Sequence, residues 1–425
     1  MTTVLEPACP TAQTQAAVAR IAATPVHLVG IRPAGEVCPE LADGRTLLHA
    51  GPPLAGAAPV PAMLGALVGC LLYEGTAGSP EQARQLIESG AVTLASCHES
   101  GGVGALTGAV TAATPVVVVE REGGRRAWAP VIEGVGKAIR FGNFDPATID
   151  RLRQIARAVA PALDRAVRAG APVDLVEMQA AALRRGDEGH NRNVAATSML
   201  ATRIAPDVLR VNDNPAALAV LQELADNHHF FLALSMAAAK ANADELHAAG
   251  PPGLVTAMCS NGHGVGIRVS GTDGWFLGRA EPELLEGIGG YLPADFAAPM
   301  GDSPVTETVG LGAMALSAAP SLGKMLGRTV QQCRDLVTQM RRICVTEHPA
   351  FQIPDLDFAP SPLGISVERV LATGIRPGFT TGFSHRDFGV GRAGFGLVRV
   401  AEAAFRDAAA ALAHTATGHR REARA

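Results

Sequence analysis

The sequence GDEGHNRNVAATSML at residues 186–200 holds the densest group of chemically reactive side chains in the chain. Within seven positions it offers two acids, a base, a cation and two carboxamides, at Asp187, Glu188, His190, Asn191, Arg192 and Asn193. Such a set can hold an anion, accept a proton and hydrogen-bond a carbonyl or an amide. Asn has a poor helix propensity and is normally avoided beside helix formers such as Ala and Leu. The composition therefore favours a polar site over a solvated surface.

The same segment runs into good helix formers, and its pattern predicts the first turns of a helix. Asp187 would then lie near the N-terminus, where a carboxylate accepts hydrogen bonds from free backbone N–H groups. Residues three and four apart share a helix face, so His190 and Asn193 would line one side. Glu188 and Arg192 fall on another face, at the spacing of an ordinary surface ion pair.

Further polar clusters, framed by Gly or Pro, lie far apart along the chain. They are Cys97-His98-Glu99, Lys137 with Arg140, Asn261 with Arg268, Asp302-Ser303 with Thr306 and Glu307, and His385-Arg386-Asp387. Each cluster by itself also has an ordinary structural explanation. For example, Glu307, four residues after Ser303, is close to a helix-capping pattern. Loops carry function more often than core elements do. We expect an active site assembled from these distant segments around one shared anion-binding cavity.

The composition indicates the size and the class of the protein that must position these side chains. The 425 residues are 48% hydrophobic and 18% charged, which is enough for two or three domains with their own cores. A formal net charge of −4 and the lack of a basic stripe argue against a nucleic-acid binder. Seven widely spaced cysteines without a C-x-x-C pair argue against a disulfide framework and a Cys-rich zinc site.

Targeting signals and nucleotide-binding or hydrolase motifs are missing from the sequence. The start, MTTVLEPACPTAQ, has no basic stretch before an apolar run, and longer apolar runs are interrupted, so we expect a soluble cytoplasmic protein. There is no Walker loop, H-E-x-x-H or G-x-S-x-G. The G-x-G-x-x-G match at residues 389–394 is rejected, because a strand pattern follows it where a dinucleotide site requires a helix.

Hydrophobic periodicity predicts a mixed α+β (α/β) protein in several parts around a central helical block. The run TPVVVVE predicts a central strand, and the Gly-rich segment from Asn261 to Gly264 predicts a hairpin. GDSPVTETVG is expected to open a helix that ends near Pro320. The predicted division is an N-terminal extension (1–45), an α/β domain (46–145), a helical domain (146–250), an α+β domain (251–405) and a C-terminal helix end and tail (406–425).

A series of long motifs follows in a fixed order from about Leu47 to Arg399. They read LHAGPP, GALVG with YEG, EGVGKAIRFG, GDEGHNRNVAATS, LSMAAAKA, VTAMCSNGHGVGIRVSG, GDSPVTETVG, IPDLDF and TGFSHRDFGVG. This set resembles the bacterial YlbE/YahG-like family, which includes a subunit of oxamate carbamoyltransferase from purine catabolism. One departure is the segment at Cys97-His98-Glu99, where family members carry a longer run of His.

The resemblance implies carbamoyl transfer between carbamoyl phosphate and a small amide or amine, with ureido compounds such as oxalurate on the other side. It also implies two partner proteins, an FdrA-like subunit and a small companion, and the Ala- and Gly-rich composition makes self-association plausible. For this chemistry the candidate bases are His190, His98 and His385, with Glu307 and Asp302 orienting the base. The candidate substrate-binding residues are the phosphate or carboxylate clamps Lys137, Arg140 and Arg192, the carboxamides Asn191 and Asn193, and Asn261, Arg268, Asp302 and Thr306.

Two other functions fit the same residues. A metal-dependent lyase or amidohydrolase would use oxygen and nitrogen ligands, for which the candidates are Asp187, His190, Asp302, Glu307 and His385. We expect no cofactor in the transferase, and a divalent metal only under this alternative. The third hypothesis is a non-catalytic subunit of a transferase complex.

Overall fold

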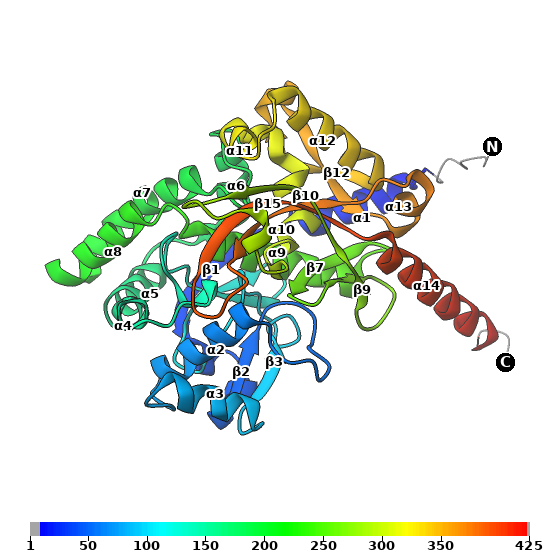
Figure 1. The fold of residues 1–425 in the computed structure, drawn as a ribbon. Helices are drawn as coiled ribbons and strands as arrows, with labels where there is room; N and C mark the ends of the chain where they lie inside the picture. The colour runs from blue at the N-terminus through cyan, green and yellow to red at the C-terminus, as the bar shows by residue number, and fades with distance from the viewer. Residues whose placement is uncertain (1–8, 423–425) are drawn as a thin grey trace.

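A computed structural model of the protein describes residues 9–422 and has the predicted mixed α+β architecture. Its strands form several small sheets, with helices between and around them (Figure 1). Helices α7 and α8 project from one side of the molecule, and α14 extends from the opposite side (Figure 1).

The first sheet is antiparallel and draws its strands from three of the predicted parts. Its order is β5-β4-β1-β6, and its members are β1 (Val26–Pro33), β4 (Pro115–Arg121), β5 (Arg126–Pro130) and β6 (Val173–Asp174). The β-branched strand β4 lies between β1 and β5, which confirms the prediction of a central strand. Since β1 pairs with β4, residues 26–33 belong to this sheet.

A parallel pair of strands with crossover helices forms the adjoining part. The strands are β2 (Thr46–His49) and β3 (Thr93–Ser96), and the helices between them are α2 (Pro61–Glu74) and α3 (Pro80–Glu88). Helix α1 (Ala12–Ala22) packs elsewhere, against β12 and α9.

The predicted helical block spans residues 146–249. It consists of α4 (Pro146–Gln154), a π-helical turn (Ile155–Val159), α5 (Ala160–Ala169), α6 (Leu175–Leu183), α7 (Val194–Val211), α8 (Asn214–Asp226) and α9 (Phe231–Ala249). Helix α9 is apolar on most of its surface and is therefore buried, in contact with β4, β5, β7 and the short helix α10. It is the central element of the largest hydrophobic cluster.

The C-terminal part contains three more sheets. One has the order β11-β7-β8-β9: β11 (Met300–Gly301), β7 (Val255–Asn261), β8 (Val265–Val269) and β9 (Phe276–Gly278). The second has the order β10-β15-β14: β10 (Ala280–Gly287), β15 (Arg392–Val400) and β14 (Gly378–Ser384). The third pairs β12 (Cys344–Ile353) with β13 (Ala359–Ile365). The predicted hairpin is confirmed, because β7 and β8 are antiparallel neighbours. Strand β15 begins inside the rejected glycine motif, at Arg392.

The expected long helix before Pro320 is replaced by shorter pieces. Helix α10 (Val305–Thr308) ends after one turn, a 3-10 stretch (Gly312–Ala318) follows, and α11 (Pro320–Met325) begins at the proline. Gly310 and Gly312 have φ angles of +94° and +60°, which a continuous α-helix does not allow. The helix prediction was wrong here because these glycines turn the backbone.

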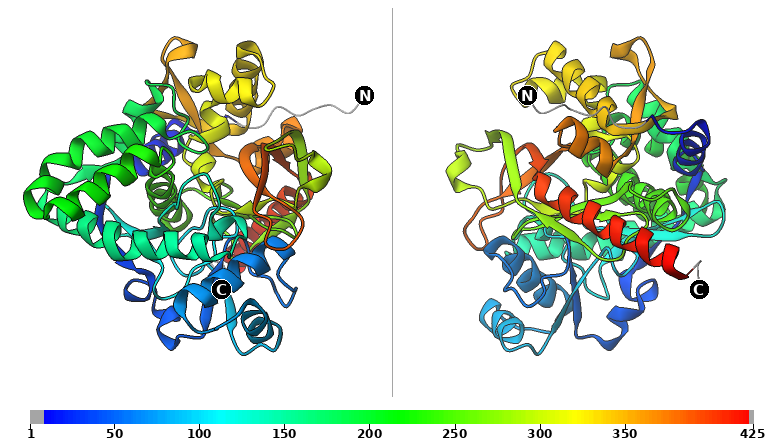
Figure 2. Two further views of the ribbon diagram at one scale, coloured as in Figure 1. Left: turned by 60° about the vertical axis from the view of Figure 1, so that its left-hand side comes forward. Right: turned by 90° about the vertical axis from the view of Figure 1, so that its right-hand side faces the viewer.

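The remaining helices cover the C-terminal sheets. They are α12 (Val330–Ile343), α13 (Val367–Thr373) and α14 (Glu402–Glu422). Figure 2 shows α14 as a long helix lying across one face of the molecule, where it packs on α13, β8 and β9. The predicted tail at 406–425 is thus part of α14 up to residue 422, and its last three residues, like residues 1–8, lie outside the described range. No helix between residues 9 and 422 is both long and apolar enough to span a bilayer.

Candidate functional site

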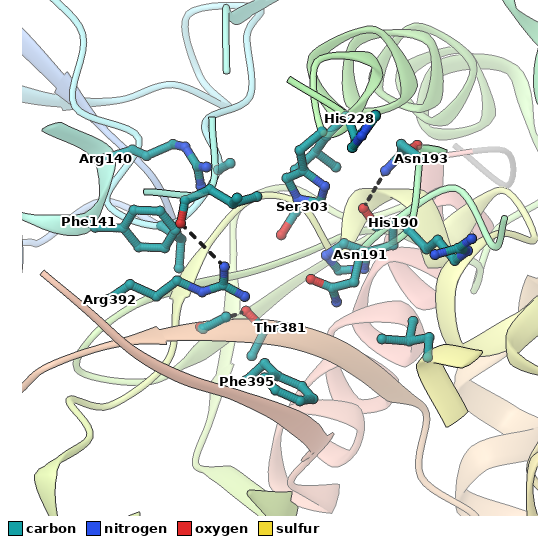
Figure 3. Close-up of a pocket in the computed structure, with 18 of the residues that line it drawn as sticks. Arg140, Phe141, His190, Asn191, Asn193, His228, Ser303, Thr381, Arg392 and Phe395 are labelled. Carbon is teal, nitrogen blue, oxygen red and sulfur yellow. Dashed lines mark hydrogen bonds between the residues drawn. The ribbon is translucent and has the colours of Figure 1, made fainter. Parts of the chain in front are cut away.

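A cavity of about 260 Å³ lies where the helical block meets the C-terminal sheets, and its walls come from segments far apart in the sequence. Figure 3 shows Arg140, Phe141 and Arg392 on one side of it and His190, Asn193 and His228 on the other. The remaining walls include Ala105, Leu106, Asn191, Arg192, Ser303, Leu322, Met325, Thr381 and Phe395.

The loop that carries the histidine wall is organised by one buried acid. The carboxylate of Glu188, which is fully buried, accepts hydrogen bonds from the backbone N–H groups of His190, Asn191 and Arg192. The bonds to Asn191 and Arg192 measure 2.6 and 3.1 Å. Burial raises the pKa of Glu188 to about 7, against the opposing effects of the nearby His190 charge and these N–H groups. The predicted surface pair of Glu188 with Arg192 was therefore wrong.

The helix predicted over this segment begins only at Val194. The backbone before it turns at Gly186 and Gly189, whose φ angles of +93° and +81° exclude a helix. Asp187 still caps α7, because its Oδ2 accepts the N–H of Ala196 at 2.9 Å. The capping role predicted for Asp187 is thus confirmed, in a loop that folds back on the start of the helix.

His190 and Glu307 form a buried pair next to the cavity. Nδ1 of His190 lies 2.9 Å from Oε1 and 3.1 Å from Oε2 of Glu307, and both side chains are at most 1% exposed. The carboxylate also accepts a hydrogen bond from Thr306 Oγ1 at 2.9 Å and one from the Ala313 N–H at 3.2 Å. Gly312 leaves room for it, since a Cβ at this position would overlap the Glu307 carboxylate.

This pairing sets the protonation of the histidine. Burial opposes a charged imidazole, but the charge of Glu307 and its hydrogen bond, together with the charge of Glu188, outweigh that effect and raise the pKa of His190. Because a carboxylate accepts from Nδ1–H, Nε2 of the neutral ring keeps its lone pair. The pair has the arrangement of an oriented general base.

The opposite wall holds two arginines around one aromatic ring. The guanidinium carbons of Arg140 and Arg392 lie 4.2 and 5.6 Å from the ring centroid of Phe141. Arg140 has a carboxylate partner, with its Nε 3.2 Å from Glu133, and burial lowers its pKa to about 10. Arg392 has no carboxylate within salt-bridge distance among the described residues. Its contacts are Phe141 and the Val135 carbonyl, 3.5 Å from Nη1, so its charge is available to an anion in the cavity.

Burial and the positive charge of this region together keep His229 neutral. Burial is the main cause that lowers the pKa of His229 to about 3, and the charges of Arg140 and Arg392 add to it. His229 lines the cavity as a neutral ring. An anion, by contrast, would meet two positive groups there.

The structure brings together about half of the predicted site. His190, Glu307, Arg140, Asn191, Arg192 and Asn193 lie in or beside the cavity, and Thr306 holds Glu307 from behind. Arg192 is a weaker clamp than expected, since its Nε donates to the Gly186 carbonyl at 2.9 Å and faces Asp187 at 3.6 Å. Asn193 donates from its amide nitrogen to the His190 carbonyl at 2.7 Å, while its buried Oδ1 has no partner.

Three predicted residues lie elsewhere for identifiable reasons. Lys137 has a side chain 71% exposed and pairs with Asp145 at 3.4 Å. His385 packs on the ring of Tyr291 at a centroid distance of 4.9 Å and accepts the Asp387 N–H at 3.0 Å. Asn261 closes the β7–β8 turn, donating to the Pro52 carbonyl and accepting from two N–H groups of the turn. Their assignment to the shared cavity was wrong.

His98, Asp302 and Arg268 lie together in a second buried region that does not line the cavity. Nε2 of His98 is 3.8 Å from Oδ1 of Asp302. Asp302 accepts the N–H groups of Gly51 and Gly104 at 2.6 and 2.7 Å, and burial raises its pKa to about 7. The donors suggested for a metal-dependent enzyme are therefore divided among separate places: His190 and Glu307 lie beside the cavity, Asp302 lies in the second region, and His385 packs on Tyr291. The prediction of one cavity that unites the side chains from His98 to His385 was therefore wrong for the described residues.

Sequence reasoning missed Arg392, Phe141, Thr381 and both His228 and His229. Arg392 lies in the Gly-rich segment that was examined only as a nucleotide motif. The only sequence signal was an arginine beside a glycine-rich turn. Arg392 is the first residue of β15, and the register of β15 with β14 decides which residues it contacts. Phe141 directly follows the predicted Arg140 in the sequence. Its contacts with the guanidinium groups of both Arg140 and Arg392 depend on the fold and could not be predicted from the sequence.

Comparison with known proteins gives one consistent answer. The family described as oxamate carbamoyltransferase subunit AllG matches residues 92–303. The oxamate carbamoyltransferase subunit AllG of Escherichia coli K12 is 36% identical over 92% of this chain and 94% of its own length. The uncharacterized protein YahG of the same organism is also 36% identical, over 93% of this chain and 84% of its own.

A solved structure supports the same grouping. A crystal structure of a conserved protein of unknown function from Enterococcus faecalis V583 superposes with a TM-score of 0.90 and 36% identity. The match covers 95% of this chain and 97% of the other. These relatives span nearly the whole chain at an identity that makes common descent plain. The chain belongs to the family of the oxamate carbamoyltransferase subunit AllG.

Proposed function

We propose that this chain supplies the substrate-binding and proton-transfer groups of a carbamoyl transfer between carbamoyl phosphate and a small amide carboxylate such as oxamate. The observation that carries the proposal is the cavity with an oriented His190–Glu307 pair on one wall and the unpaired guanidinium of Arg392 on the other. The name of the E. coli relative supports the choice of substrate.

The charges of the cavity suit these reactants. Carbamoyl phosphate and oxamate are both anions, and an arginine binds a phosphate or a carboxylate through two parallel hydrogen bonds. Arg392 would hold one anionic group, with Arg140 beside it on the other face of Phe141. The half-buried guanidinium of Arg392 has no carboxylate partner among the described residues, so an anion in the cavity would supply its counter-charge. The apolar side chains of Leu106, Leu322 and Phe395 would exclude water from the reacting groups.

The transfer forms one bond and breaks another. The amide nitrogen of the acceptor attacks the carbamoyl carbon, a C–N bond forms, the C–O bond to phosphate breaks, and inorganic phosphate leaves. The nitrogen loses a proton, which Nε2 of His190 would accept while Glu307 stabilises the resulting imidazolium. Asn191 and Asn193 would hydrogen-bond the carbamoyl group, for which the unpartnered Oδ1 of Asn193 is available.

Partner subunits belong to the same proposal. The printed name of the E. coli relative is that of a subunit, and we propose that this chain works with an FdrA-like protein and a small companion. A non-catalytic role in such a complex is the second candidate function, and the same subunit name favours it. The two differ in whether the cavity of this chain binds the reactants.

Calorimetry and an activity assay test the proposal. The purified chain is titrated with oxamate and with carbamoyl phosphate, and phosphate release and ureido product are then measured with and without the companion proteins. Binding of both reactants with turnover, alone or in the complex, supports the proposal. A complex whose turnover survives Ala at both His190 and Arg392 of this chain would assign it to the non-catalytic role.

A further inference from the structure

The second buried region contains three side chains of metal-ligand type from three separate segments. His98 follows β3, Cys259 lies in β7, and Asp302 follows β11. Their ligand atoms all lie within 4.8 Å of one another, and none of the three residues is more than 2% exposed. Nothing in the proposed transfer uses them, because none lines the cavity.

The hydrogen-bond inventory of this cluster is incomplete. Both ring nitrogens of His98 are buried and have no hydrogen-bond partner among the described residues. The Sγ atom of Cys259 has only a distant contact, 4.0 Å from the Gly266 carbonyl. A fully buried imidazole without a partner is rare in folded proteins, and an absent ion or water is the usual explanation.

The geometry and charge both suit a divalent ion. Zinc binds nitrogen, oxygen and sulfur at about 2.0–2.3 Å, which puts its ligands about 3.3–3.8 Å apart. The 3.8 Å between His98 Nε2 and Asp302 Oδ1 is already close to this spacing. A thiolate and a carboxylate would neutralise the ion. Two cations lie near the cluster, Arg268 and Lys240, and the ammonium of Lys240 is offset by Asp244, whose two oxygens lie 2.7 Å from Nζ.

We propose that His98, Cys259 and Asp302 form a binding site for a zinc-class divalent metal ion. A thiolate beside an imidazole selects zinc, or cobalt in its place, over magnesium or calcium, which prefer oxygen ligands. Three protein ligands leave the fourth tetrahedral position to a water molecule.

The ion would hold the active-site segment in place. Asp302 immediately precedes Ser303, which lines the cavity, and α10, which carries Glu307. The same carboxylate also binds the N–H groups of Gly51 and Gly104. A metal at Asp302 therefore links β7, the loop after β3 and the start of α10 behind the His190–Glu307 pair. In this proposal the ion positions the segment that carries Ser303 and Glu307, and it does not touch the reactants.

Cobalt titration tests the site independently of any enzyme activity. Reduced, metal-depleted chain is titrated with Co²⁺, and the thiolate-to-cobalt charge-transfer absorption and the bound metal are measured, then Zn²⁺ is added in competition. We expect about one equivalent of Co²⁺ with a thiolate band, which Zn²⁺ removes. Zinc should also raise the melting temperature of the depleted protein, because it binds the folded state.

Variants identify the ligands. Cys259→Ala should abolish the thiolate band, and His98→Gln should weaken Co²⁺ binding at least tenfold. Cys344→Ala is the matched control, since Cys344 is a buried free cysteine in β12 whose charged neighbours are Arg341 and Arg369. The proposal is overturned if the wild-type chain binds no Co²⁺ or Zn²⁺, or if the thiolate band persists in Cys259→Ala. The titration of wild-type protein decides this even if a variant fails to fold.

Discussion

The imidazole of His190 and the carboxylate of Glu307 meet at 2.9 Å, although one lies in the loop before α7 and the other in α10. Both are buried, and Glu307 is fixed from behind by Thr306 and by the N–H of Ala313. The pair joins the helical block to the C-terminal sheets at the edge of the cavity. Under the proposed function His190 is the base, and the charge of Glu307 raises its pKa.

Replacing Glu307 by Gln should lower the pKa of His190, because burial then acts without the opposing negative charge. A base works in its neutral form, so the acid limb of the kcat/KM profile lies above the ordinary histidine pKa in the wild type. In Glu307→Gln this limb should move to lower pH, and the maximal rate should fall about 10²-fold or more as the base loses its orientation. Glu177→Gln, on the exposed face of α6, is the control. An unshifted acid limb would remove Glu307 from this role.

Substitution of Arg392 tests the anion site. Arg392→Ala removes the unpaired guanidinium and should weaken binding of the anionic reactant about 10- to 100-fold, the effect of losing a charge-assisted hydrogen bond of about 1.5–3 kcal/mol. Arg392→Lys should recover part of the loss, because Lys keeps the charge but not the two-bond geometry. Calorimetry measures both, with Arg203→Ala on α7 as the control. Unchanged affinity in Arg392→Ala would exclude this anchor.

Much of the fold could be predicted from the sequence, because local pattern decides it. The β-branched run of β4, the apolar surface of α9 and the glycine hairpin between β7 and β8 each occupy their predicted elements. The errors in predicting helices concern glycines. At Gly186, Gly189 and Gly312 the positive φ angles break helices that the neighbouring Ala, Leu and Met residues favour.

The site residues that are neighbours in the sequence could be predicted, and those brought together only by tertiary contacts could not. His190, Asn191 and Asn193 adjoin in sequence, and all three line the cavity. Arg392 reaches the same cavity only through the register of β14 and β15, which residue types do not encode. His98 and Asp302 are also a histidine and a carboxylate, like the cavity pair, yet they meet each other in a separate region. Type and spacing identify reactive groups, but only the tertiary contacts sort them into sites.

Glu188 should act mainly on the loop, by accepting its backbone N–H groups, and on the proposed base only through its charge near His190. Glu188→Ala leaves three backbone N–H groups without their acceptor, and we expect a loss of about 2–4 kcal/mol in the free energy of unfolding. Hydrogen exchange should accelerate at the amides of residues 190–192 while α9 stays protected. Denaturant titration and exchange measured by mass spectrometry check both effects. Unchanged exchange at these amides would contradict the role of the carboxylate.

Acid should destabilise the protein through its buried neutral histidines. Burial lowers the pKa of His348 to about 4, so below the ordinary value of 6.5 the unfolded chain binds a proton that the folded chain does not. The free energy of unfolding therefore falls as the pH drops from 6.5 toward 4, by about 1.4 kcal/mol per pH unit for each such histidine. In His348→Gln the slope should be smaller by that amount, as measured by urea unfolding across this range. Equal slopes in the two proteins would contradict the assignment.

Gly312 offers the sharpest test of the His190–Glu307 pair. Gly312→Ala places a methyl group against the Glu307 carboxylate, at a φ of +60° that already disfavours a side chain. Gly374→Ala is a matched control, because Gly374 has a φ of +66° and nothing within 4 Å of an added Cβ. Both variants should lose about 1 kcal/mol of stability from the backbone strain. Only Gly312→Ala should also displace Glu307, lower the pKa of His190 measured by NMR and reduce kcat. If the two variants have the same kcat and the same His190 pKa, the space beside Glu307 does not set the state of the base.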